Sequence, residues 1–372
     1  MSKSEESGSC LKQKGFWATY REKDAYLLPY RCARVQPMSA LKHVIIGNGP
    51  AGMTAAETIR SLKHDDRIVL ISEEPHLPYS RTLLPDFIAG RVALDKLWLR
   101  SDSHYKEVRI ETQLETRVVS VVPEQQKVCT EKGEDIYFDR LLIACGGEPK
   151  LPEIAGIERV PILTLKTLND ARHILSVLQK RSRMLVLARD LVGIEITRAF
   201  CQMGLKVTYV EWGDELLPHI LDPATAEELA ERMKQAGVNL VLGETVREVE
   251  SDGDAILLRT DARAVSGDFF SVAIGKMPRL DWLRSSGIMM DSGIIADERL
   301  RTNFPGIYAA GDTAEIYDPK TQKRKLLFGW KNAVEQGRVA GANMVGEMKE
   351  FEVTYAPGLK QIFGVDVRHR WK

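Results

Sequence analysis

Residues 42–56 read Lys-His-Val-Ile-Ile-Gly-Asn-Gly-Pro-Ala-Gly-Met-Thr-Ala-Ala, which places an apolar run, a glycine-rich turn and an alanine-rich segment in direct succession. This order is typical of a strand, the turn Gly-x-Gly-x-x-Gly and a helix that together bind the pyrophosphate of a dinucleotide. Gly47 permits the tight turn, Gly49 lets the backbone approach the phosphates, and Gly52 lets the helix pack closely on the strand. The alternative is a glycine turn in another kind of α/β protein.

The composition is that of a globular protein. The chain has 372 residues, of which 44% are hydrophobic and 28% are charged, and its formal net charge is zero. This balance argues against nucleic-acid binding and against attraction to an acidic membrane. No apolar run reaches the ~18 residues of a membrane-spanning helix. The five cysteines lack a Cys-x-x-Cys spacing, which disfavours a disulfide framework, a metal site and a redox-active pair, and predicts reduced thiols in the cytoplasm.

A second apolar run, Ile68–Ile71, follows the first helical segment and ends beside two acidic residues. Glu73 and Glu74 lie about 20 residues after the glycines, where a carboxylate accepts hydrogen bonds from the ribose of a bound dinucleotide. A solvated acidic pair is the alternative interpretation.

A similar strand–turn–helix pattern recurs later with an altered turn. The apolar residues 184–187 lead into Ala188-Arg189-Asp190-Leu191-Val192-Gly193 and a helix, and the next strand ends at Glu211. Gly193 keeps the packing position, and Glu211 stands where a carboxylate would bind ribose. Asp190 replaces the glycine that admits the phosphates, so its charge repels them unless a neighbouring cation offsets it or the side chain caps the helix. We expect either a working or weakened NAD(H) site or a domain retained for structure.

Further motifs give the chain a resemblance to a known family. Residues 74–84 carry Glu-x-x-x-Pro-Tyr-x-Arg-x-x-Leu, residues 139–149 resemble Asp-x-Leu-x-x-Ala-Thr-Gly-x-x-Pro, and residues 302–312 match Thr-x-x-Pro-x-Ile-Tyr-Ala-Ala-Gly-Asp. In these motifs the chain resembles the FAD-dependent pyridine nucleotide-disulfide oxidoreductases, in the branch of the NADH:rubredoxin and ferredoxin reductases. Disulfide reductases of the family carry cysteine in the first loop, where this chain has Pro75. Thiol chemistry at the flavin is therefore disfavoured.

The resemblance implies an α/β fold with two Rossmann-like dinucleotide-binding domains, the FAD domain discontinuous and the NAD domain inserted into it. The expected parts are a poorly ordered extension at 1–37, the FAD domain at 38–150 and 268–350, the NAD(H)-binding-like domain at 151–267, and the start of a truncated or absent C-terminal interface domain at 351–372.

The resemblance also implies which residues hold the cofactors. Arg81 is expected to contact FAD, Val118 to pack against adenine, and Asp312 to bind the ribityl chain. The helix after Phe328 is expected to close the flavin pocket. The expected FAD-binding residues are Gly47, Gly49, Pro50, Ala51, Gly52, Glu73, Glu74, Arg81, Val118, Ala144, Gly146, Gly311, Asp312, Phe328, Gly329 and Trp330, and those for NADH are Gly193 and Glu211.

These features predict an FAD-dependent NAD(P)H oxidoreductase that passes electrons between NADH and an iron–sulfur or other redox protein. No side chain is singled out as catalytic, because the flavin carries the chemistry. Two alternatives stay open. One is an FAD electron-transfer subunit of a larger oxidoreductase complex. The other is a non-catalytic, redox-responsive flavoprotein with a vestigial NAD domain, which the altered turn at Asp190 favours.

Overall fold

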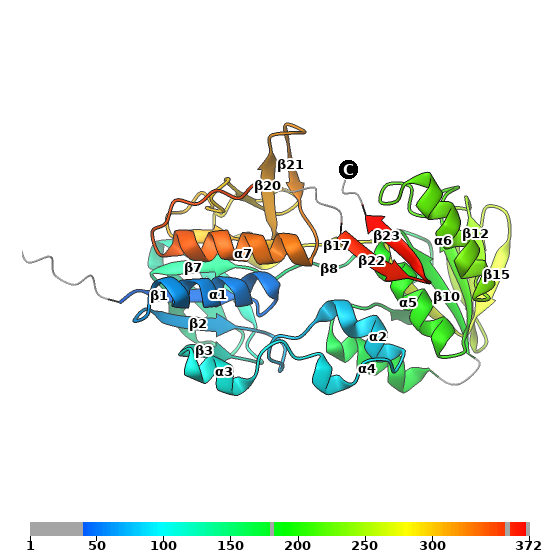
Figure 1. The fold of residues 1–372 in the computed structure, drawn as a ribbon, viewed down its shortest axis with the longest axis horizontal. Coiled ribbons are helices and arrows are strands. Elements are labelled where there is room, and N and C mark those ends of the chain that lie inside the picture. Colours follow the sequence, from blue (N-terminus) through cyan, green and yellow to red (C-terminus); the bar gives the residue numbers. More distant parts are fainter. Residues whose placement is uncertain (1–39, 179–181, 354–357, 370–372) are drawn as a thin grey trace, which may run out of the picture. The chain divides into compact units, whose positions relative to one another are not determined.

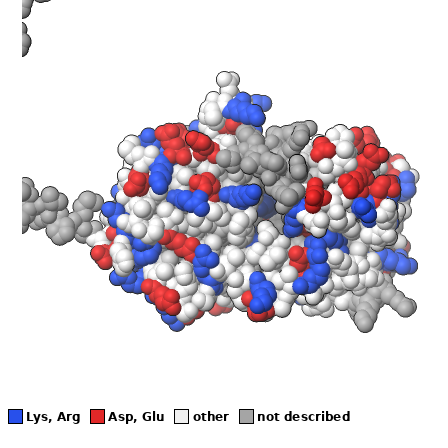
Figure 2. All heavy atoms as spheres, viewed as in Figure 1, with Lys and Arg blue, Asp and Glu red and all other residues white. Residues whose placement is uncertain are grey.

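The computed structural model describes residues 40–178, 182–353 and 358–369 (Figure 1). The extension predicted at 1–37 lies outside these residues. Lys and Arg side chains are interspersed with Asp and Glu over the face shown in Figure 2, in keeping with the zero net charge. Within the described residues, we find no helix with the length and apolarity needed to cross a membrane.

The first sheet is parallel and is built around the strand that precedes the glycine-rich turn. This strand, β1 (Lys42–Ile46), pairs with β2 (Arg67–Ile71) on one side and with β7 (Arg140–Ile143) on the other. Outside these lie β3 (Ile110–Gln113) and β19 (Ile307–Ala309), which gives the order β19-β7-β1-β2-β3. Because β19 comes from the far end of the chain, the first domain is discontinuous, as predicted.

Two helices lie side by side on one face of this sheet (Figure 1), α1 (Pro50–Leu62) and α7 (Trp330–Met344). Their contact depends on glycine. A Cβ added at Gly337 of α7 would lie 2.2 Å from the carbonyl oxygen of Ala51. The two backbones therefore approach more closely than any larger residue would allow, and this contact fixes the beginning of α1.

Smaller elements complete the first domain. The antiparallel strands β4 (Val118–Val122), β5 (Lys127–Thr130) and β6 (Asp135–Tyr137) form a three-stranded sheet whose apolar side chains join the same core. The short helix α3 (Asp102–Glu107) packs beside β3.

The second sheet is also parallel, in the order β12-β11-β10-β16-β9. Its strands are β10 (Arg183–Ala188), β11 (Lys206–Glu211), β12 (Asn239–Leu242), β9 (Ile162–Leu163) and β16 (Phe269–Ala273). Since β16 pairs with β10, the inserted domain continues past the end predicted at residue 267. The prediction missed this because a buried apolar strand fits either sheet by pattern alone.

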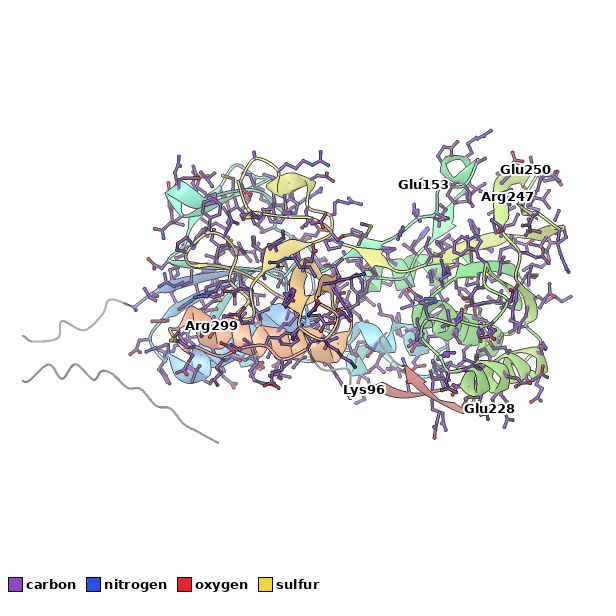
Figure 3. The ribbon with its side chains drawn as sticks, turned by 90° about the horizontal axis from the view of Figure 1, so that it is seen from above. Lys96, Glu153, Glu228, Arg247, Glu250 and Arg299 are labelled. Carbon is purple, nitrogen blue, oxygen red and sulfur yellow. The ribbon has the colours of Figure 1, made fainter. Side chains whose placement is uncertain are left out.

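Each face of the second sheet has its own cover. The helices α4 (Leu168–Val177), α5 (Leu191–Gln202) and α6 (Pro223–Gln235) pack on one face. The strands β13 (Val246–Asp252), β14 (Ala255–Thr260) and β15 (Ala264–Gly267) cover the other. In Figure 3, Glu228 on α6 and Glu250 on β13 mark these two sides.

The chain passes between the two sheets along a short antiparallel pair, β8 (Glu148–Pro149) and β17 (Lys276–Met277). Beyond the second crossing, β18 (Ile294–Ala296), β20 (Ala314–Asp318) and β21 (Lys323–Leu326) form a small sheet. The hairpin of β20 and β21 projects past α7 in Figure 1. The described part of the predicted segment 351–372 ends in a further hairpin, β22 (Gly358–Ile362) and β23 (Val365–His369).

Candidate flavin and nicotinamide sites

The first glycine-rich turn has the geometry of a phosphate cradle. A Cβ at Gly47, whose φ is +110°, would lie 2.2 Å from the carbonyl oxygen of Ala144, and one at Gly52 would lie 1.8 Å from that of Gly47. These two glycines are therefore required by close backbone contact. By contrast, a Cβ at Gly49 would meet nothing within 4 Å. Gly49 faces open space, which fits a position that a pyrophosphate approaches.

The helix that follows this turn begins without a side-chain cap. Gly49 is the N-cap of α1 and makes no side-chain hydrogen bond, and Pro50 is the first helical residue. The N–H groups of an uncapped first turn are satisfied by a ligand or by water, and their partial positive charge favours an anion. Gly311, whose φ is +77°, comes close to this turn, since an added Cβ would lie 3.1 Å from the Cβ of Ala51.

A buried amide beside Gly311 has one group without a partner. Gln336 of α7 is fully buried, and its Oε1 accepts a hydrogen bond of 2.7 Å from the Gly311 backbone N–H. Its Nε2 makes no hydrogen bond with the described residues. A buried donor without a partner is costly, so it indicates a ligand acceptor at this place. Gln336 was not predicted, because an isolated Gln within a helix carries no local signal.

The carboxylate of Asp312 lies between two donors. It pairs with the ammonium of Lys276 and accepts a hydrogen bond of 3.3 Å from the backbone N–H of Gly329, the N-cap of α7. The Lys276 ammonium also lies 5.6 Å from the ring centroid of Phe328. The structure thus brings together Asp312, Phe328, Gly329 and the start of α7 at Trp330, as predicted, and adds Lys276, whose partner is too distant in sequence to be found from a local pattern.

The crossing segment before β8 lines the same region. Ala144 supplies the carbonyl against Gly47, and the Gly146 carbonyl accepts a hydrogen bond of 3.0 Å from the Thr313 hydroxyl. The Cys145 Sγ lies 3.4 Å from that same hydroxyl, and burial raises the pKa of its thiol. This cysteine therefore remains a protonated and weakly reactive group.

The predicted carboxylates after β2 have different environments. Glu74 pairs with the guanidinium of Arg81 and accepts a hydrogen bond of 2.6 Å from the Tyr79 hydroxyl. With these partners Glu74 positions Arg81, and its contact with a ribose stays a prediction. Glu73 is exposed and lies 3.9 Å from Arg117, so it is the acid that remains open to a ribose. The difference arises because the path of the loop beyond Glu74 is not readable from spacing.

Arg81 also joins the first domain to the segment before α4. Its Nη1 donates a hydrogen bond of 2.8 Å to the Lys166 carbonyl, in addition to the pair with Glu74. Val118 begins β4 and is buried in the first core. Contacts of Arg81 and Val118 with FAD stay predictions.

The second turn is occupied by its own side chain. One carboxylate oxygen of Asp190 accepts a hydrogen bond of 3.0 Å from the Gly193 N–H, and the other accepts one of 3.0 Å from the Gly275 N–H. Burial raises the pKa of Asp190 to about 6, although these backbone donors oppose that rise. Gly193 itself has the predicted packing role, since an added Cβ would lie 2.2 Å from the Cβ of Ala188. Asp190 caps α5 at the turn position that corresponds to Gly49 in the first domain.

Glu211 does not face a nucleotide. It is fully buried, its two oxygens lie 3.1 and 3.2 Å from the Leu217 N–H, and it accepts a hydrogen bond of 3.2 Å from the Tyr209 hydroxyl. Burial raises its pKa to about 7. In this geometry the carboxylate is not open to a ribose, because the loop after β11 returns over the strand end and donates the Leu217 N–H to it.

Comparison with known proteins agrees with these features. The family model described as pyridine nucleotide-disulphide oxidoreductase matches residues 41–337. A ferredoxin–NAD(+) reductase component of the 3-phenylpropionate/cinnamic acid dioxygenase from Photorhabdus laumondii is 29% identical over 305 residues, which are 82% of this chain and 77% of that relative. The epsilon subunit of an NADH-dependent phenylglyoxylate dehydrogenase from Aromatoleum evansii is 28% identical over 324 residues, 87% of this chain and 75% of the subunit.

A solved structure shows the same fold. The crystal structure of the covalent putidaredoxin reductase–putidaredoxin complex superposes with a TM-score of 0.77 at 24% identity, over 86% of this chain and 78% of that one. The predicted two-domain α/β fold is confirmed, and so is the assignment to flavoprotein oxidoreductases that bind FAD and use NAD(P)H. The chain therefore belongs to the pyridine nucleotide-disulphide oxidoreductase family.

Proposed function

We propose that this chain binds FAD at the first glycine-rich turn and passes electrons between NADH and an iron–sulfur protein. The observation that carries the proposal is the open position of Gly49 at the uncapped start of α1. The Nε2 of Gln336, which has no partner among the described residues and lies on the amide bound to Gly311, supports the same placement.

The residues present fit this cofactor. FAD, when bound, supplies both the acceptance of a hydride and the release of single electrons. The first turn of α1 holds the diphosphate through backbone N–H groups. Asp312 accepts hydrogen bonds from hydroxyl groups of the cofactor, and Gln336 donates its free N–H. The start of α7 at Gly329 presents partial positive charge, which favours added negative charge nearby.

The proposed partner is an acidic protein, because the surface next to this site is basic. Residues 319–334 contain five basic residues and no acidic one: Lys320, Lys323, Arg324, Lys325 and Lys331. Lys323, Arg324 and Lys331 are exposed, and Figure 2 shows basic side chains near the end of the projecting hairpin. This segment contains Phe328 and the first residues of α7. Opposite charge on a partner would steer it toward the flavin.

A second candidate function is an electron-transfer subunit within a larger complex. The similarity to the epsilon subunit of phenylglyoxylate dehydrogenase favours it. Both functions use the same flavin site. For either function we propose a cytoplasmic location. Co-purification of the native protein with further subunits that show iron–sulfur absorbance would select the complex, and an isolated active chain would select the first candidate.

Stopped-flow spectroscopy tests the proposed function. The purified protein should be yellow and carry stoichiometric FAD. NADH should bleach the flavin absorbance band (~450 nm). An acidic ferredoxin added afterwards should restore the colour. A flavin that is not bleached by millimolar NADH, at either acidic or neutral pH, would refute electron transfer from NADH.

A further inference from the structure

The two glycine-rich turns of this chain differ in how the N-terminus of the following helix is capped, and packing around the turn does not require this difference. Gly49 leaves the N-terminus of α1 uncapped, whereas Asp190 caps α5 with its own carboxylate. Gly193 keeps the packing role of the third glycine, since an added Cβ would lie 2.2 Å from the Cβ of Ala188. The difference therefore lies in what occupies the space beside the helix N-terminus.

The Asp190 carboxylate is bound as an anion would be. Its two oxygens take separate backbone donors, the N–H of Gly193 in α5 and the N–H of Gly275 after β16, each at 3.0 Å. Donors that converge from a helix N-terminus and a neighbouring loop are those that a dinucleotide phosphate would use. A phosphate and this carboxylate cannot occupy the same donors together.

We propose that Asp190 is an internal competitor for the second nucleotide site, so that a dinucleotide binds only when this side chain leaves the donors of Gly193 and Gly275. The inference rests on the proposed function in one respect, namely that NAD(H) uses this domain. It makes Asp190 a residue that sets nucleotide affinity. Glu211, which is fully buried against Leu217, adds no ribose contact that would offset the loss.

Protonation is one route by which Asp190 becomes a weaker competitor. The charged and titratable groups around it are Lys276 on β17, Glu211 and Tyr209 on β11, and Arg189 in the turn itself. Lys276 lowers the pKa of Asp190, and burial, the larger effect, raises it to about 6. The Asp190 charge in turn raises the pKa of Glu211. Nucleotide affinity should therefore increase as the pH falls through 6, and the group responsible must be distinguished by substitution.

Calorimetric titration of the FAD-loaded protein with NAD⁺ tests the proposal directly. In Asp190→Gly the donors are released and we expect NAD⁺ to bind at least tenfold more tightly at pH 8 than in the unchanged protein. The unchanged protein should itself bind at least fivefold more tightly at pH 5.5 than at pH 8. Asp190→Asn keeps a capping side chain without charge, so its affinity should lie between the other two and vary less than twofold with pH.

Asp222→Asn is the matched control, because Asp222 caps α6 in the same domain through the Thr225 N–H. Its NAD⁺ affinity should equal that of the unchanged protein at both pH values. Equal affinity in the unchanged protein, Asp190→Gly and Asp190→Asn, with normal thermal unfolding, would overturn the proposal. Tight NAD⁺ binding in Asp190→Gly without flavin bleaching by NADH would refute the proposed function and leave the competitor role intact.

Discussion

Gly49 and Asp190 stand at equivalent positions of their turns, and the physical demand on each is different. Gly49 has free space beyond its Cα, so a side chain there is tolerated by the protein itself. We predict that Gly49→Val leaves the apoprotein folded and lowers FAD affinity at least tenfold, about 1.4 kcal/mol or more. Flavin absorbance per protein after gel filtration measures the loss, and thermal unfolding of the two apoproteins is the control. Stoichiometric FAD in the variant would refute the assignment of this turn.

Glu211 gives the protein a stability that depends on pH. Its pKa rises from 4.5 to about 7 on folding because burial disfavours the charge. The folded chain thus keeps a proton that the unfolded chain releases, so this contribution is complete below pH 4.5 and is lost as the pH rises to about 7. A shift of this size corresponds to roughly 3 kcal/mol.

We therefore predict that Glu211→Gln unfolds at a higher temperature than the unchanged protein at pH 8 and at a similar temperature at pH 5. Scanning calorimetry at the two pH values measures the difference, and Glu228→Gln, at an exposed position on α6, serves as the control. The same pH dependence in all three proteins would show that Glu211 does not titrate in this range.

The sequence predicts single residues well where a motif marks the steric demand. Gly47, Gly52 and Gly193 stand at fixed positions of the glycine-rich pattern, and in the structure each lies against backbone or a neighbouring Cβ. The partners that Glu74 and Glu211 have in the structure are not predictable from spacing, because they depend on where a loop returns. Sequence spacing shows that a carboxylate follows a strand. It does not show whether a donor of the same chain forms a hydrogen bond with that carboxylate and so blocks a ligand.

Among the elements, α7 shows how a distant segment fixes the flavin turn. Its Gly337 lies against Ala51 in α1, where an added Cβ would come within 2.2 Å of a backbone oxygen. Backbone cannot move aside as a flexible side chain can, so overpacking of this contact should cost about 1–3 kcal/mol. The sequence pattern predicts α1 and the family resemblance implies α7, whereas their pairing joins residues too far apart in sequence for any periodic pattern to show.

We predict that Gly337→Ala lowers both the unfolding temperature and the FAD occupancy, because α1 must shift at its first turn. Arg338→Ala, one residue further along α7 at an exposed position, should change neither property. Thermal unfolding and flavin absorbance of the two variants measure this. Loss of stability with full FAD occupancy would mean that the flavin turn does not depend on the position of α7.

At the scale of the whole molecule, zero net charge conceals an uneven distribution. The run at 319–334 carries five basic residues without an acidic one, and it contains the flavin-site residues Phe328 and Gly329. Composition alone predicts no charged partner, whereas the position of Lys323, Arg324 and Lys325 on the projecting hairpin of β20 and β21 favours one (Figure 1). Long-range attraction of this kind acts mainly on the association rate and weakens with salt.

We predict that Lys323→Glu combined with Arg324→Glu raises the KM for an acidic ferredoxin at least tenfold at low ionic strength and flattens the dependence of the rate on salt. Flavin bleaching by NADH should be unchanged, because neither residue belongs to the flavin or nicotinamide site. Lys206→Glu with Arg232→Glu makes the same change of charge on the second domain, at two exposed positions. If both double variants lose ferredoxin activity equally, then total charge matters and the hairpin does not. If only the hairpin variant loses activity, the ferredoxin docks at the hairpin of β20 and β21, next in sequence to the flavin-site residues Phe328 and Gly329.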